Sequence, residues 1–193
     1  LPTEEITDGQ VEIIGPDLHD IKPGETLPMG IVVEVGGARF QKDFEPILER
    51  QIHKFINGAQ GIWHAGQRNI NWLRISVQSY EKGFRLSHIG KIIHAKYQET
   101  YSSILDRVQV KIYTDEAKVK ELLERAKVSY KERDDRIAGL SDEKVDTYYS
   151  CALFQSFSTD HVFIITPELK GLCGAYNWLD GKSAYEIDPY WVN

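Results

Sequence analysis

The hydrophobic and polar positions along the chain follow two alternating periods, which predicts helices interspersed with strands. Apolar side chains recur at helical spacing over residues 43–59, over 87–105, and after a helix cap at Thr114 or Asp115. Runs rich in β-branched residues predict strands at 11–14, 31–35, 72–76, 108–113 and 162–165. This alternation predicts an α/β (α+β) fold in which helices flank a mixed β-sheet.

Three segments carry more detailed predictions. Residues 63–69 follow the first helix and contain glycine and polar residues, which predicts a loop. Residues 108–113 alternate apolar and polar side chains, which predicts a half-exposed strand, whereas 162–165 predict a buried one. The third helix has an apolar face and an opposite charged face, for which we expect solvation and helical ion pairs. The charged face consists of Lys118, Glu121, Glu124, Lys127, Lys131 and Glu132.

A composition shift near Ser141, after the charged helix, predicts two domains, one over residues 1–140 and one over 141–193. The hydrophobic content of 41% and charged content of 27% indicate a folded globular protein. No apolar run reaches the ~20 residues of a membrane span, so we expect no membrane association. Two cysteines do not form a secreted disulfide framework, so we expect a cytoplasmic location. Because the first residue is Leu rather than Met, we expect a processed product or a piece of a longer protein.

The net charge of −6 conceals a cationic window over residues 63–96. The window holds one acid, Glu81, and its net charge is +5. Its basic residues are Arg68, Arg74, Lys82, Arg85, Lys91 and Lys96, with His64, His88 and His94 beside them. A cationic window in an acidic chain favours a local anion site over a nucleic-acid surface.

The two cysteines, Cys151 and Cys173, suggest a metal-cluster motif from which half the ligands are missing. An iron–sulfur cluster requires four converging thiolates. With residues 154 and 163 the spacing would be C-x₂-C-x₈-C-x₉-C, but Phe154 and Phe163 occupy those two positions. A phenyl ring donates no electron pair, so we expect an apolar filling, with both cysteines as small buried hydrophobic residues. A zinc site could add His161, but no fourth donor is evident.

Seven stretches carry a resemblance to a known family: residues 11–17, 30–35, 43–52, 63–68, 71–76, 132–139 and 171–180. Through them the chain resembles, nearly end to end, the acetyl-CoA synthase (acetyl-CoA decarbonylase/synthase β) subunit of the carbon monoxide dehydrogenase complex. The resemblance implies a CO-methylating acetyl-CoA synthase, an acyltransferase that joins CO, a corrinoid-borne methyl group and coenzyme A. It implies a [4Fe–4S] cluster bridged to two nickel ions.

The family's cluster cysteines correspond to Cys151, Phe154, Phe163 and Cys173, and Phe154 stands where the nickel-bridging thiolate would be. A later Cys-Gly-Cys that holds the outer nickel does not occur before Asn193. Two of the six implied thiolates therefore remain. We expect this chain alone to bind no cluster and no nickel, and to lack synthase activity.

The resemblance also implies that the first domain associates with coenzyme A. Arginine forks suit its phosphates and indole faces suit its adenine, which makes Trp63, Arg68, Trp72, Arg74 and Arg85 the predicted contacts. The structural alternative is that Trp72 or Leu73 lies in the core and that Arg74 pairs with an acid.

Two other functions stay open at this point. One is a non-catalytic protein that binds other subunits of the complex. The other is a working synthase whose missing ligands come from another chain, against which Phe154 and Phe163 argue. The partners implied by the resemblance are carbon monoxide dehydrogenase subunits, the corrinoid iron–sulfur protein and ferredoxin, with no nucleic acid among them.

Overall fold

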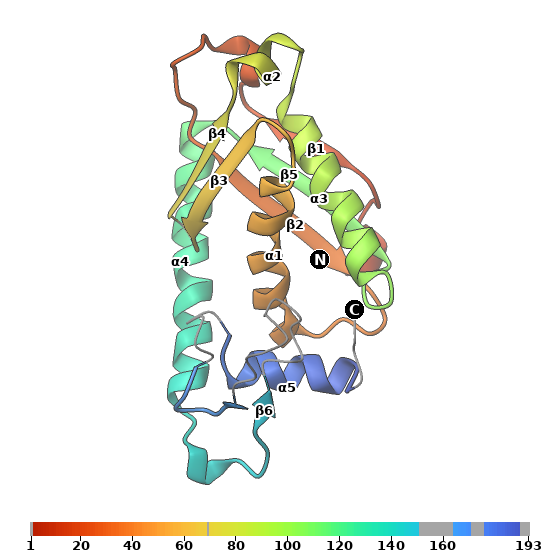
Figure 1. The fold of residues 1–193 in the computed structure, drawn as a ribbon, viewed down its shortest axis with the longest axis vertical. Coiled ribbons are helices and arrows are strands. Elements are labelled where there is room, and N and C mark those ends of the chain that lie inside the picture. The colour runs from red at the N-terminus through yellow and green to blue at the C-terminus, as the bar shows by residue number, and fades with distance from the viewer. Residues whose placement is uncertain (1, 69, 151–163, 171–175, 190–193) are drawn as a thin grey trace. The chain divides into compact units, whose positions relative to one another are not determined.

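The computed structural model describes residues 2–68, 70–150, 164–170 and 176–189 (Figure 1). The chain forms two compact units. Unit 1 comprises Leu1–Phe40 and Arg50–Val128, and unit 2 comprises Gln41–Glu49 and Ser129–Asn193. Two helices, α1 (Glu45–Asn57) and α4 (Glu116–Ala138), contribute residues to both units. The predicted domain boundary after residue 140 stays a prediction.

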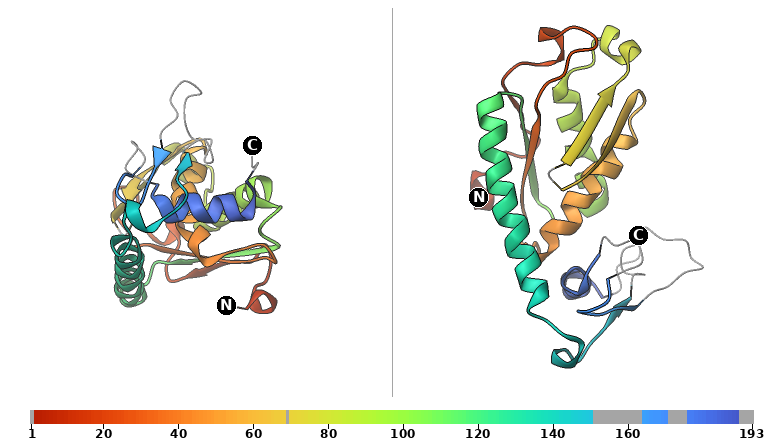
Figure 2. Two further views of the ribbon diagram at one scale, coloured as in Figure 1. Left: turned by 90° about the horizontal axis from the view of Figure 1, so that it is seen from below. Right: turned by 90° about the vertical axis from the view of Figure 1, so that its left-hand side faces the viewer.

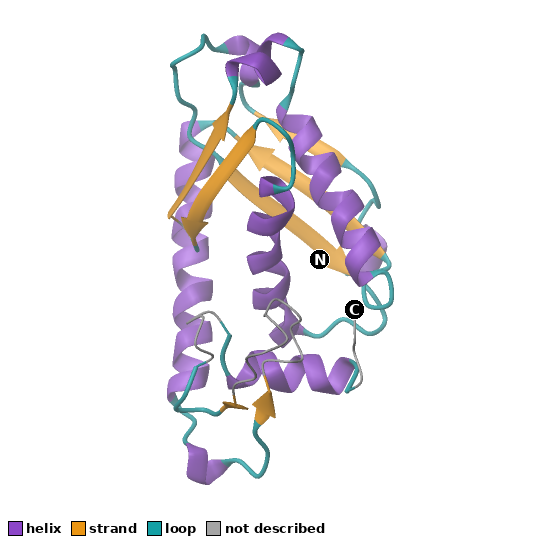
Figure 3. Cartoon of the chain, in the orientation of Figure 1, coloured by secondary structure: helices purple, strands orange, loops and turns teal. Residues whose placement is uncertain are grey.

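Unit 1 is built on a mixed three-stranded sheet, as the strand and helix pattern predicts (Figure 3). The strand order is β1-β5-β2; β1 runs parallel to β5, and β2 runs antiparallel to it. A separate hairpin pairs β3 with β4. The strands are β1 (Val11–Ile14), β2 (Gly30–Gly36), β3 (Ile62–Gln67), β4 (Ile70–Ile75) and β5 (Arg107–Tyr113). The helices within this unit are η1 (Thr3–Glu5), η2 (Leu18–Asp20), α2 (Val77–Glu81) and α3 (Leu86–Tyr101).

Helices cover both faces of this sheet, with α3 on one side and α4 on the other (Figure 2). Ile89 and Ile93 of α3 are fully buried, and Gly90 permits close contact with β1, since a Cβ there would lie 2.4 Å from Cγ1 of Val11. On the other face, Leu122 of α4 lies against Gly30 of β2. The amphipathic prediction for α4 is confirmed, with the charged face exposed and ion-paired, as in Lys127–Glu124 at 2.7 Å. Among the described residues, no helix combines the length and apolar character needed to cross a bilayer.

The predictions for two strands of unit 1 are wrong. Residues 63–67, predicted to be a loop, belong to strand β3. Strand β5, predicted to be half-exposed, is the central strand and is buried on both faces along most of its length. Its polar residue Gln109 is 5% exposed, because its carbonyl oxygen accepts from the Thr7 N–H at 2.8 Å and its amide donates to Glu34. Satisfied hydrogen bonds therefore allow a polar side chain to be buried in this strand.

Unit 2 contains η3 (Lys42–Phe44), η4 (Asp142–Lys144), β6 (Tyr149–Ser150), β7 (Ile164–Ile165), α5 (Trp178–Ile187) and the adjoining parts of α1 and α4. Ion pairs join the segment 41–49 to α4. Arg133 contacts Glu49 at 2.5 Å and Glu45 at 3.5 Å, and its guanidinium lies 5.7 Å from the ring centroid of Tyr130. Burial opposes the Arg133 charge, but these two carboxylates raise its pKa overall. Of the strand predicted at 162–165, the described residues are Ile164, which is exposed, and Ile165, which is buried.

An ion pair on the sheet of unit 1 predicts a pH dependence of stability. Burial raises the pKa of Glu34, but hydrogen bonds from Gln109 and Lys111 lower it more, so the net pKa lies below the ordinary value. A depressed carboxyl pKa stabilises the fold above the unfolded-state pKa of about 4.3, and the contribution is lost as pH falls through the folded-state pKa.

We therefore expect Glu34→Gln to lower the free energy of unfolding by about 1 kcal/mol at pH 7. The difference from the unsubstituted chain should shrink towards zero as the pH falls below about 4. Urea unfolding at several pH values measures both quantities, with Glu5→Gln, at an exposed position, as the control. A difference that stays constant with pH would contradict the ionic role of Glu34.

Candidate functional site

The β3–β4 hairpin presents aromatic and cationic side chains on one face. In its antiparallel register Trp63 lies opposite Arg74, and Ala65 lies opposite Trp72. Opposite residues share a face and successive residues alternate, so Trp63, Trp72 and Arg74 project to the same side. Trp63 is 57% exposed, Trp72 is 70% exposed, and Arg74 is exposed as well. We call these three side chains the Trp–Arg face.

The other side of the hairpin is held by α1. The Asn57 side-chain amide donates to the His64 carbonyl at 2.7 Å, and the His64 N–H donates to Oδ1 of Asn57 at 2.5 Å. The Nδ1 atoms of His53 and His64 lie 2.8 Å apart, so one ring donates and the other accepts. Ile62 and His64 are buried on this side. Because successive side chains alternate, burial of His64 directs its neighbour Trp63 outward.

The exposure of two indoles beside an exposed guanidinium is consistent with a binding surface. Full burial of a large apolar side chain stabilises a fold by roughly 1.5–3 kcal/mol. Trp63 and Trp72 do not contribute this full stabilisation, because both remain largely exposed. Clustered exposed apolar groups mark interaction sites more often than single ones do. Among the described residues, no carboxylate forms an ion pair with Arg74. Of the two residues that the structural alternative offered to the core, Trp72 is exposed, whereas Leu73 is half-buried and lies opposite the buried His64.

The other two predicted coenzyme A contacts lie elsewhere in unit 1. Arg68 is in the hairpin turn with a φ of 52° and is exposed. It precedes Trp72 by four positions and lies at the turn end of the hairpin, whereas Trp63 and Arg74 lie nearer the open end. Arg85 is half-buried at the N-cap of α3, and its backbone N–H donates to Nδ1 of His88 at 2.9 Å. The structure thus brings together three of the five predicted residues.

Two pockets adjoin the hairpin. The first has a volume of about 360 Å³ and lies between strand β4 and residues 18–29. Its walls are mainly apolar and include Trp72, Leu73, Ile75 and Leu86. The Tyr80 hydroxyl donates to the Ile21 carbonyl at 3.0 Å, and this hydrogen bond joins the segment 18–29 to α2. Trp72 therefore belongs to the Trp–Arg face and also lines this apolar pocket.

The second pocket, of about 280 Å³, is lined by Gln60, Gly61, Gln78, Ser79, Lys82, Gly83, Phe84 and His88. We call it the donor pocket. It lies at the open end of the hairpin, since Gly61 precedes β3 and its carbonyl accepts from the N–H of Ser76, which follows β4. Sequence reasoning counted Lys82 and His88 in the cationic window but did not group them. The lining comes from two stretches, residues 60–61 and 78–88, which the fold brings together.

The predicted metal positions, Cys151, Phe154, Phe163 and Cys173, lie outside the described residues. The structure describes the two residues that flank the stretch 151–163, in which the first three of these positions fall. Ser150 precedes Cys151 and Ile164 follows Phe163, and these two residues are register partners in the β6–β7 pair. The described part of the chain contains no group of three or more His, Cys, Asp or Glu side chains that could hold a metal ion.

Comparison with known proteins identifies the family. A family model described as CO dehydrogenase/acetyl-CoA synthase complex beta subunit matches residues 1–119, and one that describes the C-terminal part of the ACS/CODH beta subunit matches residues 130–193. The chain is 59% identical over 184 residues to the carbon monoxide dehydrogenase/acetyl-CoA synthase subunit alpha of Moorella thermoacetica, which covers 95% of this chain and 25% of that protein. It is 45% identical over 186 residues to the acetyl-CoA decarbonylase/synthase complex subunit beta of Methanopyrus kandleri, covering 96% of this chain and 40% of that protein.

These matches define a class of proteins that are described as subunits of the CO dehydrogenase/acetyl-CoA synthase complex. Within that class, the chain belongs to the beta-subunit family. The predicted family is thereby confirmed. The chain spans between a quarter and two fifths of the length of these relatives.

The hydrogen bonds between α1 and the hairpin can be tested by removing the Asn57 side chain. Asn57→Ala leaves the His64 N–H and carbonyl without these partners in a part-buried setting, where the loss of one hydrogen bond costs about 0.5–1.5 kcal/mol. We expect the free energy of unfolding to fall by about 1–2 kcal/mol. Urea unfolding followed by far-UV circular dichroism measures this change.

Lys54→Ala, at an exposed position on the same helix, is the control and should change stability by less than about 0.5 kcal/mol. Equal stability of the two variants would contradict the anchoring role of Asn57.

Proposed function

We propose that this chain is the coenzyme A-binding part of a CO-methylating acetyl-CoA synthase, and that the Trp–Arg face is its main contact with the cofactor. The observation that carries the proposal is the presence of two exposed indoles and an arginine without an ion-pair partner among the described residues on one hairpin face. Membership of the acetyl-CoA synthase family supports coenzyme A as the ligand, since the name of the Moorella relative includes acetyl-CoA, the acetyl ester of coenzyme A.

The chemistry of coenzyme A matches this surface. Its adenine can stack on an indole, which contributes roughly 1–3 kcal/mol per base. Its phosphates accept forked hydrogen bonds from Arg74, and a charged hydrogen bond contributes roughly 1.5–3 kcal/mol. After the costs of association, a few such contacts correspond to dissociation constants between micromolar and millimolar. The apolar pocket beside Trp72 offers further contact to the pantetheine arm.

The metal chemistry of the family does not fit the donors of this chain. A [4Fe–4S] cluster takes four thiolates, whereas the four corresponding positions hold Cys151, Phe154, Phe163 and Cys173. Two thiolates and two phenyl rings cannot satisfy four iron atoms. We propose that the chain alone binds neither cluster nor nickel and makes no acetyl-CoA, and that its role is confined to the cofactor and to its protein partners.

A second candidate function is docking to other subunits of the complex. Unit 2 exposes four large apolar or aromatic side chains among its described residues: Tyr148, Ile164, Leu169 and Tyr185. The relatives are named as subunits of a complex, which supports partners in general. The family's partners, carbon monoxide dehydrogenase subunits, the corrinoid iron–sulfur protein and ferredoxin, are the candidates. Pull-down with the purified corrinoid protein tests this function independently of coenzyme A.

Coenzyme A binding is tested by titration of the chain with the cofactor at low and high salt, followed by tryptophan fluorescence and calorimetry. We expect Trp72→Ala and Arg74→Met each to weaken binding roughly tenfold, through loss of stacking and of a charged hydrogen bond. We expect affinity to fall as salt rises, because Arg74 contributes electrostatically. The control is Arg125→Met, which removes an exposed arginine on α4. No fluorescence change at millimolar coenzyme A would contradict the proposal.

Metal binding is tested by analysis of iron, nickel and sulfide in the purified chain after anaerobic reconstitution. We expect far less than one cluster per chain, because the donors are too few. The matched variant carries both Phe154→Cys and Phe163→Cys, which restores four thiolates, and it should take up iron with a brown colour. Stoichiometric cluster in the unsubstituted chain would contradict this interpretation of the donor set.

A further inference from the structure

Ser79, Lys82 and His88 each bring a hydrogen-bond donor to the lining of the donor pocket, beside Gln60 and Gln78, whose side-chain amides both donate and accept. Lys82 brings an ammonium group and is exposed, with no ion pair among the described residues. The His88 ring accepts the Arg85 N–H at Nδ1, so in the neutral ring the proton is on Nε2. The hydroxyl of Ser76 donates to Oγ of Ser79 at 3.0 Å, which leaves the Ser79 proton for another acceptor.

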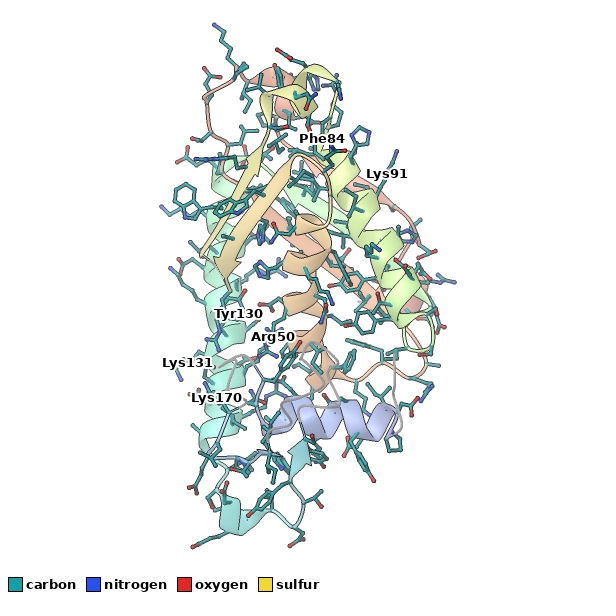
Figure 4. The ribbon with its side chains drawn as sticks, in the orientation of Figure 1. Arg50, Phe84, Lys91, Tyr130, Lys131 and Lys170 are labelled. Carbon is teal, nitrogen blue, oxygen red and sulfur yellow. The ribbon has the colours of Figure 1, made fainter. Side chains whose placement is uncertain are left out.

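The walls of the pocket are fixed by local geometry. The Phe84 ring lies 5.2 Å from the His88 ring between centroids, and the Phe84 N–H donates to the Ser79 carbonyl at 3.0 Å. Gly61 has a φ of 81°, and a Cβ there would lie 2.1 Å from Oγ of Ser79, so only glycine allows this close approach. Of the donors in this lining, Ser79 belongs to α2, Lys82 is its C-cap, and His88 lies in the first turn of α3. Figure 4 shows Phe84 where α2 gives way to α3, with Lys91 further along α3.

These features select the kind of ligand. Among the described residues, no carboxylate lines the pocket, which disfavours a divalent cation, since such ions take oxygen ligands. Phe84 is the one large apolar side chain among these lining residues, which disfavours an apolar ligand. A volume of about 280 Å³ lies below the usual range of roughly 300–1,000 Å³ for drug-sized ligands. What fits is a small anion with several acceptor oxygens that meet a cation and neutral donors at once.

We propose that the donor pocket of Ser79, Lys82 and His88 binds a phosphate group. The phosphate belongs either to free inorganic phosphate or to a phosphate ester such as the 3′-phosphate of coenzyme A. For coenzyme A the inference rests on the proposed function, whereas for inorganic phosphate it does not. The Trp–Arg face and the donor pocket share no residue, so the two can be tested separately.

The test titrates the 193-residue chain with inorganic phosphate at low salt, with the dissociation constant from calorimetry and the His88 ring signals from NMR. We expect the His88 signals to shift. Loss of one charged hydrogen bond predicts that Lys82→Met weakens phosphate binding roughly tenfold or more. Ser79→Ala should weaken it less. Lys91→Met is the matched control, since it removes an exposed lysine of α3 that does not line the pocket, and should change affinity less than about twofold. Equal phosphate affinity of Lys82→Met and the unsubstituted chain, or unshifted His88 signals, would overturn the inference.

A second arm distinguishes the sources of phosphate by comparison of coenzyme A with dephospho-coenzyme A, which lacks the 3′-phosphate. If the pocket takes that group, coenzyme A binds roughly tenfold tighter, and Lys82→Met removes the difference. If both cofactors bind alike while Lys82→Met weakens inorganic phosphate, the pocket is a site for the free ion. Phosphate binding without any coenzyme A binding would overturn the proposed function and retain the pocket. Weaker coenzyme A binding by the Trp72→Ala variant, with phosphate affinity unchanged, would support both.

Discussion

The pair of hydrogen bonds between Asn57 and the backbone of His64 is the interaction on which the candidate site depends. It joins strand β3 to the end of α1 at His64, and Ile62 and His64 of that strand are buried. Strand alternation then leaves Trp63 no direction but outward. A shift of one residue in the register would turn every side chain over, burying an arginine and exposing isoleucine. The outward direction of the surface proposed to bind coenzyme A therefore follows from the burial of the residues that alternate with it.

Patterns along the chain predicted the parts of the fold in which burial follows local periodicity. Strand β1 occupies residues 11–14, as its β-branched run indicates, and α4 has the expected apolar and charged faces. Strand β3 was missed because its inward residue His64 is polar and Gly66 interrupts it, so the sequence lacks a strand-like alternation. The burial of Gln109 in β5 could not be predicted, since it depends on Thr7 and Glu34, which are distant in sequence.

The sequence predicted which types of side chain the candidate site contains, but it predicted only in part which of them lie together. Charge asymmetry and the family resemblance led to Trp63, Trp72 and Arg74, which strand pairing places together. The same reasoning included Arg68 and Arg85, because proximity in sequence could not reveal that one lies in a turn and the other caps α3. The donor pocket escaped sequence reasoning for the opposite reason, since it joins Gly61 to Lys82 and His88 through the fold.

The two proposed roles of this chain, coenzyme A binding and docking to other subunits, are assigned to different units. Unit 1 carries the groups that suit a phosphorylated cofactor, and the cysteine segment lacks donors for the metal chemistry of its family. The most direct measurement is of NMR contacts between the adenine protons of bound coenzyme A and the indole protons of an isotope-labelled chain. We expect nuclear Overhauser effects from the adenine protons to the indole protons of Trp63 or Trp72. Bound coenzyme A whose adenine contacts neither indole would contradict it.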